Sequence, residues 1–232
     1  MALALARAGA SVVLWARQAT TLQRVAKTIH TFGRPSLVQV VDVTDAPAIR
    51  RAVTQALRRF GQLDIVVNNA GMWGGDPLVR LSRKIWSDVV ATDLTSVFLV
   101  SQAVAPIMIR QRYGKIINVA STSGFLAHHD GAAYCTAKAG VMHLSRVMAV
   151  EWGPYGIRVN CIAPGLFRTA MTSDVFADRA WLARRRRQVP LRRFGEPDDL
   201  AGLAVFLASR GSDHITGQTI VIDGGASLAV GA

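Results

Sequence analysis

Short, mostly apolar runs separate longer amphipathic stretches along the whole chain. They recur at residues 11–16, 37–41, 63–67, 115–119 and 157–162, and once more in "GQTIVIDGG" near the C-terminus. Apolar runs of this length predict buried strands. The stretches between them place apolar residues three and four positions apart, which predicts amphipathic helices. The pattern therefore predicts a chain in which strands alternate with helices.

This alternation indicates the fold class. Strands that are apolar on both faces and alternate with helices predict a parallel sheet covered by helices on both sides. We expect one doubly wound α/β domain, because 232 residues, half of them hydrophobic, suffice for one core and no linker divides them. Ligands of such folds bind at the carboxyl ends of the strands. The candidate ligand-binding positions are therefore those that follow the strands: Arg17, Asp42, 68–71, 120–123 and 164–169.

The first residues predict the second half of a strand–helix–strand unit. Residues 1–8 predict a helix, Gly9 lies where a helix-ending glycine is expected, and the strand 11–16 follows. The sequence has no strand and no glycine-rich turn before this helix.

The formal net charge of +12 raises the question of nucleic-acid binding. The one dense basic cluster is 184–187 together with Arg192 and Arg193. Four consecutive arginines on a helix point in all directions around it, and no aromatic residues alternate with them. We interpret the cluster as a solvated surface, with an anionic substrate as the alternative. We expect no nucleic-acid partner.

The sequence also gives no indication of a membrane span, a signal peptide or a metal site. No apolar stretch is expected to reach the 18 or more residues of a membrane span. Residues 1–16 are interrupted by Arg7 and follow no basic region, so they do not predict a signal peptide. Cys135 and Cys161 have neither metal-ligand spacing nor a disulfide framework. We therefore expect reduced cysteines, no metal, no membrane and a cytoplasmic location.

The most specific chemical signal is the pair Tyr134 and Lys138 in "YCTAK". Positions four apart share one face of a helix. A nearby ammonium favours the phenolate and lowers the pKa of the phenol from about 10 toward neutrality, so such a pair can transfer a proton. Ser121, which ends the preceding strand, can hold a substrate oxygen through its hydroxyl. The plainer alternatives are a tyrosine packed on a lysine stem and a serine in a turn.

Several motifs in this order resemble the short-chain dehydrogenase/reductase family. They are "DVTD", "NNAG", "LTSVF", "NVAS", "YCTAKAG", "RVNCIAPG" and the terminal "GQTIVIDGG", and together they span essentially the whole chain. The resemblance implies a single Rossmann-type domain, residues 1–232, that binds NAD or NADP. It also implies an oxidoreductase that interconverts a secondary alcohol and a ketone by hydride transfer.

The resemblance also implies a role for each matching residue. Tyr134 would be the catalytic acid/base, and Lys138 would lower its pKa and bind the nicotinamide ribose. Ser121 would orient the reacting oxygen, with Ser123 as a rival at a less suitable offset. The implied cofactor contacts are Asp42 and Val43 at the adenine, Asn69, Ala70 and Gly71 along the cofactor, Pro164, Gly165 and Phe167 at the nicotinamide, and Thr169 on its carboxamide.

Arg17 favours NADP(H) over NAD(H). NAD enzymes of this fold hold the ribose hydroxyls with an acid at the end of the second strand, whereas NADP enzymes place an arginine near the 2′-phosphate. Here that stretch reads "LWAR", with Ala16 at the acidic position and Arg17 after it. The alternative is that Arg17 is an exposed loop residue.

The sequence departs from the family pattern in two places. Asp93 stands where the family has a fourth catalytic residue, an asparagine; a carboxylate only accepts hydrogen bonds, and its charge would favour a charged Lys138. The first strand and its glycine-rich turn, which would hold the cofactor pyrophosphate, are missing. We expect an N-terminally truncated form, in which the loss of this central strand either exposes two rows of backbone groups or brings the neighbouring strands together.

Residues 166–193 correspond to the mobile substrate lid of the family. The lid and the ending "GGASLAV" resemble the gluconate 5-dehydrogenase branch, which acts on sugar acids and polyols. Arginines in a lid suit a carboxylate, although a solvated lid explains them equally well. The resemblance also implies a homo-oligomer, a tetramer or a dimer. The alternative function is a non-catalytic member of the family that acts as a partner subunit.

Overall fold

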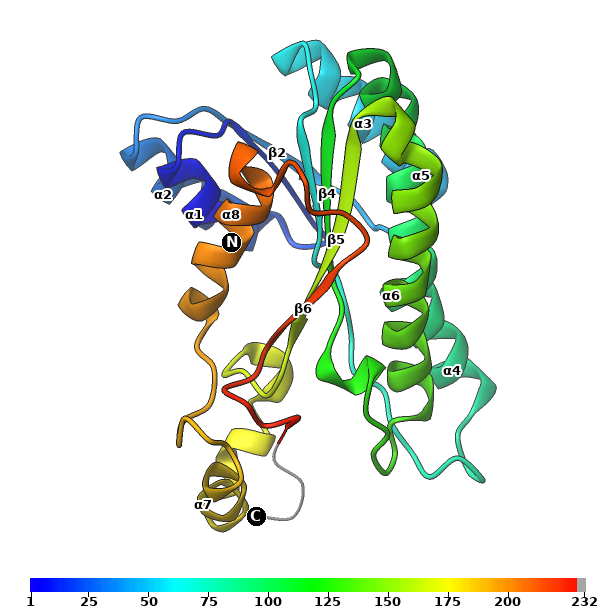
Figure 1. Ribbon diagram of the computed structural model, residues 1–232, viewed down its shortest axis with the longest axis vertical. Coiled ribbons are helices and arrows are strands. Elements are labelled where there is room, and N and C mark those ends of the chain that lie inside the picture. The colour runs from blue at the N-terminus through cyan, green and yellow to red at the C-terminus, as the bar shows by residue number, and fades with distance from the viewer. Residues whose placement is uncertain (229–232) are drawn as a thin grey trace.

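The computed structural model describes residues 1–228, and its strands form two parallel sheets (Figure 1). The first sheet pairs β1 (Val12–Ala16) with β2 (Ser36–Val40). The second has the order β3 (Ile65–Asn68), β4 (Gly114–Val119), β5 (Ile157–Pro164) and β6 (Thr219–Ile222). The predicted α/β architecture with parallel strands is confirmed. The prediction of one sheet is wrong for the described residues, because β1 and β3 do not pair.

Helices cover both faces of these sheets (Figure 1). The helices are α1 (Ala2–Arg7), α2 (Ala19–Thr31), α3 (Ala46–Phe60), α4 (Arg83–Val90), α5 (Ser96–Gln111), α6 (Ala132–Trp152), α7 (Arg179–Arg187) and α8 (Ala201–Ala208). Helices α3, α5 and α6 pack together on one face, while α1 and α8 contact each other on the opposite face. This three-layer arrangement follows from strands that are apolar on both sides.

Helix α3 shows how local sequence fixes an element. The Asp45 side chain accepts a hydrogen bond from the Ala48 amide at 3.0 Å, which caps the helix N-terminus. The helix ends at Gly61, whose φ of 78° is a left-handed conformation that glycine adopts without strain. Both ends of the helix are therefore fixed by residues next to it in the sequence.

Helices α4 and α5 are joined by a π-helical turn, Ala91–Thr95. The combined helix Arg83–Gln111 is 29 residues long and is apolar enough, with a mean hydropathy of 1.4 over 18 residues, to cross a membrane by length and composition. The expectation that no stretch has this length is therefore wrong. Half of that window is buried inside the protein, where α5 packs on α3, β3 and β4, so core packing accounts for its apolarity.

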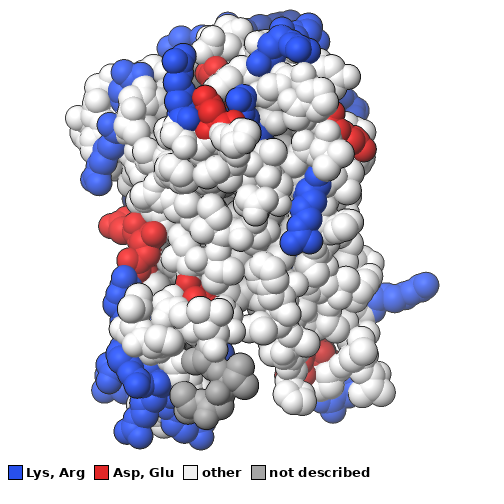
Figure 2. Space-filling view, viewed as in Figure 1, with Lys and Arg blue, Asp and Glu red and all other residues white. Residues whose placement is uncertain are grey.

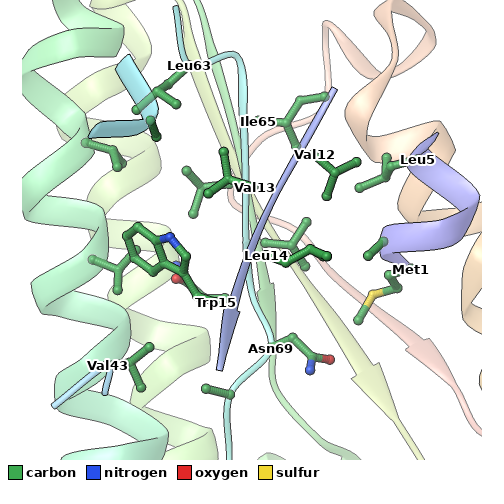
Figure 3. A pocket seen from close by; sticks show the side chains of 18 of the residues that line it. Met1, Leu5, Val12, Val13, Leu14, Trp15, Val43, Leu63, Ile65 and Asn69 are labelled. Atoms are coloured by element: carbon green, nitrogen blue, oxygen red, sulfur yellow. The ribbon is translucent and has the colours of Figure 1, made fainter. Parts of the chain in front are cut away.

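Burial differs sharply between the strands. Strands β4 and β5 are almost wholly buried, whereas most residues of β1 and β3 are only half-buried. Between β1 and β3 lies a cavity of about 1800 Å³, which we call the slot; its lining includes both strands (Figure 3). The sequence left two arrangements open: exposed rows of backbone groups, or neighbouring strands that pair. The structure has the first, because β1 and β3 do not pair.

Candidate active site

Ser121 follows β4 and begins a short 3₁₀ turn, Thr122–Gly124. Its Oγ accepts a hydrogen bond from the Ser123 amide at 3.1 Å, so the turn role that the sequence left open is present. The same hydroxyl lies beside the phenol of Tyr134 and favours its ionised form. Ser121 is largely buried, with 8% of its surface exposed. The turn thus holds the hydroxyl beside Tyr134.

Tyr134 and Lys138 lie one turn apart on α6, as the spacing predicts. Burial raises the pKa of Tyr134 to about 12; the hydrogen bond with Ser121 opposes this shift, and the charge of Asp93 adds to it. The expectation that Lys138 lowers this pKa toward neutrality is therefore wrong for the structure as described. The Lys138 Nζ lies 5.5 Å from the centre of the Tyr134 ring and is engaged elsewhere.

Lys138 pairs with Asp93. The Lys138 Nζ lies 2.9 Å from Asp93 Oδ1 and donates a hydrogen bond to the carbonyl oxygen of Val119 at 3.1 Å. Asp93 is fully buried in the π-helical turn, and its Oδ2 accepts from the Met72 amide at 2.9 Å. A side chain at Gly71 would collide with this pair, because its Cβ would come within 2.7 Å of Asp93 Oδ1. The pair locates the lysine ammonium and leaves one of its three donors for a ligand.

An aromatic group that the sequence did not reveal stands beside Tyr134. The Trp73 ring packs edge-on against Tyr134 with centroids 5.3 Å apart, and it stacks on His128 at 5.6 Å. His128 Nε2 lies 3.0 Å from Ser123 Oγ and 3.4 Å from Cys135 Sγ. The sequence signal for this aromatic group was the tryptophan within the glycine-rich stretch "GMWGG". In the structure that tryptophan is partly exposed.

The predicted contacts at the adenine end lie along the slot. Six of the predicted cofactor residues line it: Arg17, Asp42, Val43, Asn69, Ala70 and Gly71. The Asp42 carboxylate accepts hydrogen bonds from the backbone and the hydroxyl of Thr44, at 2.9 and 2.7 Å. These bonds, together with the charge of Arg17, lower the pKa of Asp42. These residues come from the carboxyl ends of β1, β2 and β3, where ligands of parallel sheets bind.

The predicted contacts at the nicotinamide end lie elsewhere, after β5. Pro164 ends that strand, and a side chain at Gly165 would come within 2.6 Å of Asp223. Phe167 is buried and packs against Gly195, so its ring fills the base of the lid. The Thr169 hydroxyl is occupied by Thr172, 3.2 Å away. None of these four predicted residues lines the slot.

The lid contains α7 and two short 3₁₀ turns. The four consecutive arginines, 184–187, occupy the last turn of α7 and are exposed, and lysine and arginine side chains gather at this end of the molecule in Figure 2. They surround the helix as the sequence predicts. No described group of three or more His, Cys, Asp or Glu residues has the arrangement of a metal site.

Comparisons with known proteins show which family this chain resembles over its length. A family model described as "Enoyl-(Acyl carrier protein) reductase" matches residues 1–227. The gluconate 5-dehydrogenase of Gluconobacter oxydans is 40% identical over 99% of this chain and 90% of its own length. The 5-keto-D-gluconate 5-reductase of Escherichia coli is 35% identical, with 99% and 91% covered.

A solved structure is equally similar. The crystal structure of a gluconate 5-dehydrogenase from Burkholderia cenocepacia, in complex with NADP and tartrate, superposes with a TM-score of 0.94. It is 37% identical, and the match covers 99% of this chain and 90% of that one. The fold, the site and these matches define an oxidoreductase with an NAD(P)-binding Rossmann fold. The chain belongs to the short-chain dehydrogenase/reductase family, and the relatives named here act on sugar acids according to their names.

The described residues fit parts of a nicotinamide dinucleotide. The slot reaches Arg17 and Asp42 at one end of the predicted site, and the free donor of Lys138 lies at the other. Among residues 1–228, no glycine-rich turn leads into a helix N-terminus between them. The adenosine and the reacting end therefore have candidate partners, whereas the pyrophosphate has no backbone cradle in the described part of the chain.

Proposed function

We propose that the protein is an NAD(P)-dependent oxidoreductase that interconverts a secondary alcohol and a ketone on a sugar acid or polyol. The observation that carries this proposal is the group formed by Ser121, Tyr134 and Lys138, which brings two hydroxyls together beside a buried ammonium. The names of the relatives support the substrate class.

The raised pKa of Tyr134 favours one direction of proton transfer. A phenol with a pKa of about 12 is protonated at neutral pH, so it is ready to donate a proton to a ketone oxygen. Ser121 would hold the same oxygen from its other side. Lys138 would bind the nicotinamide ribose through its remaining donor, while Asp93 and the Val119 carbonyl fix its position. A bound nicotinamide supplies the hydride.

The test of the proposal is turnover of 5-ketogluconate with NADPH or NADH, followed by nicotinamide absorbance. Tyr134→Phe removes the proton donor but keeps the ring, so we expect kcat to fall by about 10²–10⁴-fold. The matched control is Tyr155→Phe, because Tyr155 lies in an exposed turn far along the chain from the site. Equal activity of the two variants would contradict the role of Tyr134. Turnover of a 3-oxoacyl thioester in place of the keto sugar acid would contradict the substrate class.

We propose NADP(H) as the preferred cofactor. Arg17 is exposed at the carboxyl end of β1, lines the slot and has no acid beside it on that strand. Arg17→Ala should raise the KM for NADPH by about tenfold, because an arginine–phosphate contact is a charge-assisted hydrogen bond, and should leave the KM for NADH nearly unchanged. Arg24→Ala, on the exposed face of α2, is the control. An equal rise in the KM for NADPH and for NADH would show that Arg17 does not recognise the 2′-phosphate.

The second candidate function is a non-catalytic partner subunit. It is favoured by the open slot and by the lack of a pyrophosphate cradle among the described residues. Titration with NADPH, followed by nicotinamide fluorescence, separates the two: saturable binding supports the enzyme, and its absence supports the partner subunit. We further propose a cytoplasmic homo-oligomer with no nucleic-acid or membrane partner, which sedimentation and salt-dependent DNA retention would test.

A further inference from the structure

A thiol, an imidazole and a backbone carbonyl follow one another beside the candidate active site. The Cys135 Sγ lies 3.4 Å from His128 Nε2, close enough for a hydrogen bond that involves sulfur. On the other side of the ring, His128 Nδ1 lies 3.2 Å from the carbonyl oxygen of His129. The proton transfer proposed for Tyr134 uses none of these three groups.

The carbonyl of His129 decides which nitrogen of the His128 ring carries a proton. A carbonyl oxygen only accepts hydrogen bonds, so the neutral ring has its proton on Nδ1 and a free lone pair on Nε2. That lone pair can take the proton of the Cys135 thiol and leave a thiolate, the form of cysteine that reacts. A nucleophile, a base and a group that orients the base are the arrangement by which proteins activate a thiol.

Ser123 provides a second contact to the same nitrogen. Its Oγ lies 3.0 Å from His128 Nε2. While the ring is neutral, the serine hydroxyl shares the lone pair of Nε2 with the thiol. Once the ring has taken the thiol proton, Ser123 Oγ can accept a hydrogen bond from the new N–H, and the His129 carbonyl still accepts from the other nitrogen. Both nitrogens of the protonated ring therefore have acceptors, which stabilises the ion pair of imidazolium and thiolate.

The surroundings of the Cys135 sulfur are accessible but narrow. Cys135 is half-buried, and His128 is exposed. A Cβ at Gly131 would come within 2.8 Å of the sulfur and 2.6 Å of the His128 ring, so the loop before α6 closes tightly over the pair. The Trp73 ring stacks on His128 with centroids 5.6 Å apart. A small reagent fits this space better than a bulky one.

We propose that Cys135 is an oxidation site, at which His128 activates the thiol toward hydrogen peroxide. The thiolate sulfur attacks one peroxide oxygen, so that an S–O bond forms while the O–O bond breaks. The sulfur loses two electrons and becomes a sulfenic acid, and the peroxide gains them and leaves as hydroxide. The protonated His128 gives its proton to that hydroxide, and the second product is water. The site goes beyond the proposed oxidoreductase activity and does not rest on it.

The oxidised sulfur would act on the candidate active site through direct contacts. Cys135 follows Tyr134 on α6, and Trp73 packs against both Tyr134 and His128. An oxygen added to a sulfur that lies 3.4 Å from His128 needs space, so the His128 ring and the stacked Trp73 ring have to shift. Burial is the main cause of the raised pKa of Tyr134, and a negative charge on Cys135 adds to it, so the two side chains also interact electrostatically.

The other cysteine of the chain is an internal control. Cys161 is fully buried, and its thiol lies 3.0 Å from Ser145 Oγ. Burial raises the pKa of Cys161, which keeps the thiol protonated. Cys161 should therefore remain unmodified as long as the chain is folded, and its modification reports unfolding.

Dimedone, which labels sulfenic acids, tests the proposal on the full chain after brief exposure to hydrogen peroxide at pH 7. Mass spectrometry of the peptides should find the label on Cys135 and not on Cys161. An ordinary thiol, with a pKa of about 8.5, is about 3% ionised at pH 7, so complete ionisation raises the reactive fraction about thirtyfold. We expect Cys135 to be oxidised about tenfold faster, or more, than N-acetylcysteine under the same conditions.

Two neighbouring histidines give a matched pair of variants. His128→Gln keeps a polar side chain but removes the base, so oxidation of Cys135 should slow about tenfold or more. His129→Gln is the control, because His129 contributes its backbone carbonyl, which this change keeps. Label on Cys161 would identify a variant that does not fold, and the comparison of the unmodified chain with N-acetylcysteine then decides.

Three results would overturn the proposal. The first is oxidation of Cys135 no faster than that of N-acetylcysteine. The second is an equal rate in the unmodified chain and in folded His128→Gln. The third is the same slowing in His129→Gln as in His128→Gln, which would assign the effect to the loop and not to the imidazole of His128.

Discussion

The two halves of the sheet differ in how completely they are assembled. Strands β4 and β5 have partners on both edges and are buried almost throughout, and the groups proposed for proton transfer follow β4 or face it from α6. Strands β1 and β3 each have one open edge and mostly half-buried side chains, and the residues proposed to contact the nucleotide follow the carboxyl ends of β1, β2 and β3. Close packing around β4 and β5 therefore positions the groups proposed for proton transfer. The residues proposed to bind the nucleotide instead surround the open slot between β1 and β3.

The largest expected effect is on the free energy of unfolding, and it compares one isoleucine on β5 with one on β3. Ile162 on β5 is fully buried, and Ile65 on β3 is half-buried against the same cluster. Ile162→Ala should lower the free energy of unfolding by about 3 kcal/mol, because the close-packed surroundings cannot collapse, and Ile65→Ala by about 1 kcal/mol. Urea unfolding curves measure both values. Equal losses would mean that β3 is packed as tightly as β5 in solution.

A smaller effect concerns the polar networks of the two halves. Trp15 Nε1 donates to Gln39 Oε1 at 2.7 Å in a half-buried position beside the slot. Asn118 is fully buried and bonds the side chains of Asn68 and Ser145, at 2.8 and 2.7 Å. We expect Trp15→Phe to cost about 1 kcal/mol and Asn118→Ala about 2–3 kcal/mol, because Trp15 lines the open slot, where water can replace the lost bond, whereas Asn118 is fully buried. The order of the two unfolding midpoints is the readout, and its reversal would contradict the comparison.

The smallest effect is a shift in titration within the assembled half. Asp93 raises the pKa of Tyr134, so Asp93→Asn should lower that pKa below its value of about 12. The pKa is measured from tyrosinate absorbance as a function of pH. Subtracting the curve of a protein that also carries Tyr134→Phe removes the signals of Tyr113 and Tyr155. The pH–rate profile should move to lower pH in parallel. Unmoved curves would show that the Asp93 charge is screened from the phenol.

The same raised pKa links Tyr134 to stability at alkaline pH. Its value in the folded protein lies above the ordinary value of about 10, so the fold favours the neutral phenol. This contribution to stability is complete below pH 10 and is lost as the pH rises toward 12. In Asp93→Asn the loss should be smaller and should end at lower pH, because the folded-state pKa of its phenol lies closer to the ordinary value.

Periodicity and spacing predicted much of this arrangement. The strands are local, mostly apolar runs and α6 contains Tyr134 and Lys138 at helical spacing, so these features need no knowledge of distant contacts. Loop conformation was not predictable in this way. Trp73 packs against Tyr134 and His128 stacks on Trp73 from a separate loop, and the ring of Phe167, a predicted cofactor contact, is buried against Gly195.

The sequence by itself determined the order of strands and helices, the shared face of Tyr134 and Lys138, and the resemblance that assigns the family, because each depends on residues close along the chain or on whole motifs. The expected charge of Asp93 beside Lys138 is confirmed by the ion pair at 2.9 Å. Only the tertiary structure decided that the pKa of Tyr134 rises instead of falling, and that β1 and β3 remain apart. Electrostatic shifts and strand pairing depend on distances and burial between segments far apart in sequence, and the pattern of residues along a chain does not contain those distances.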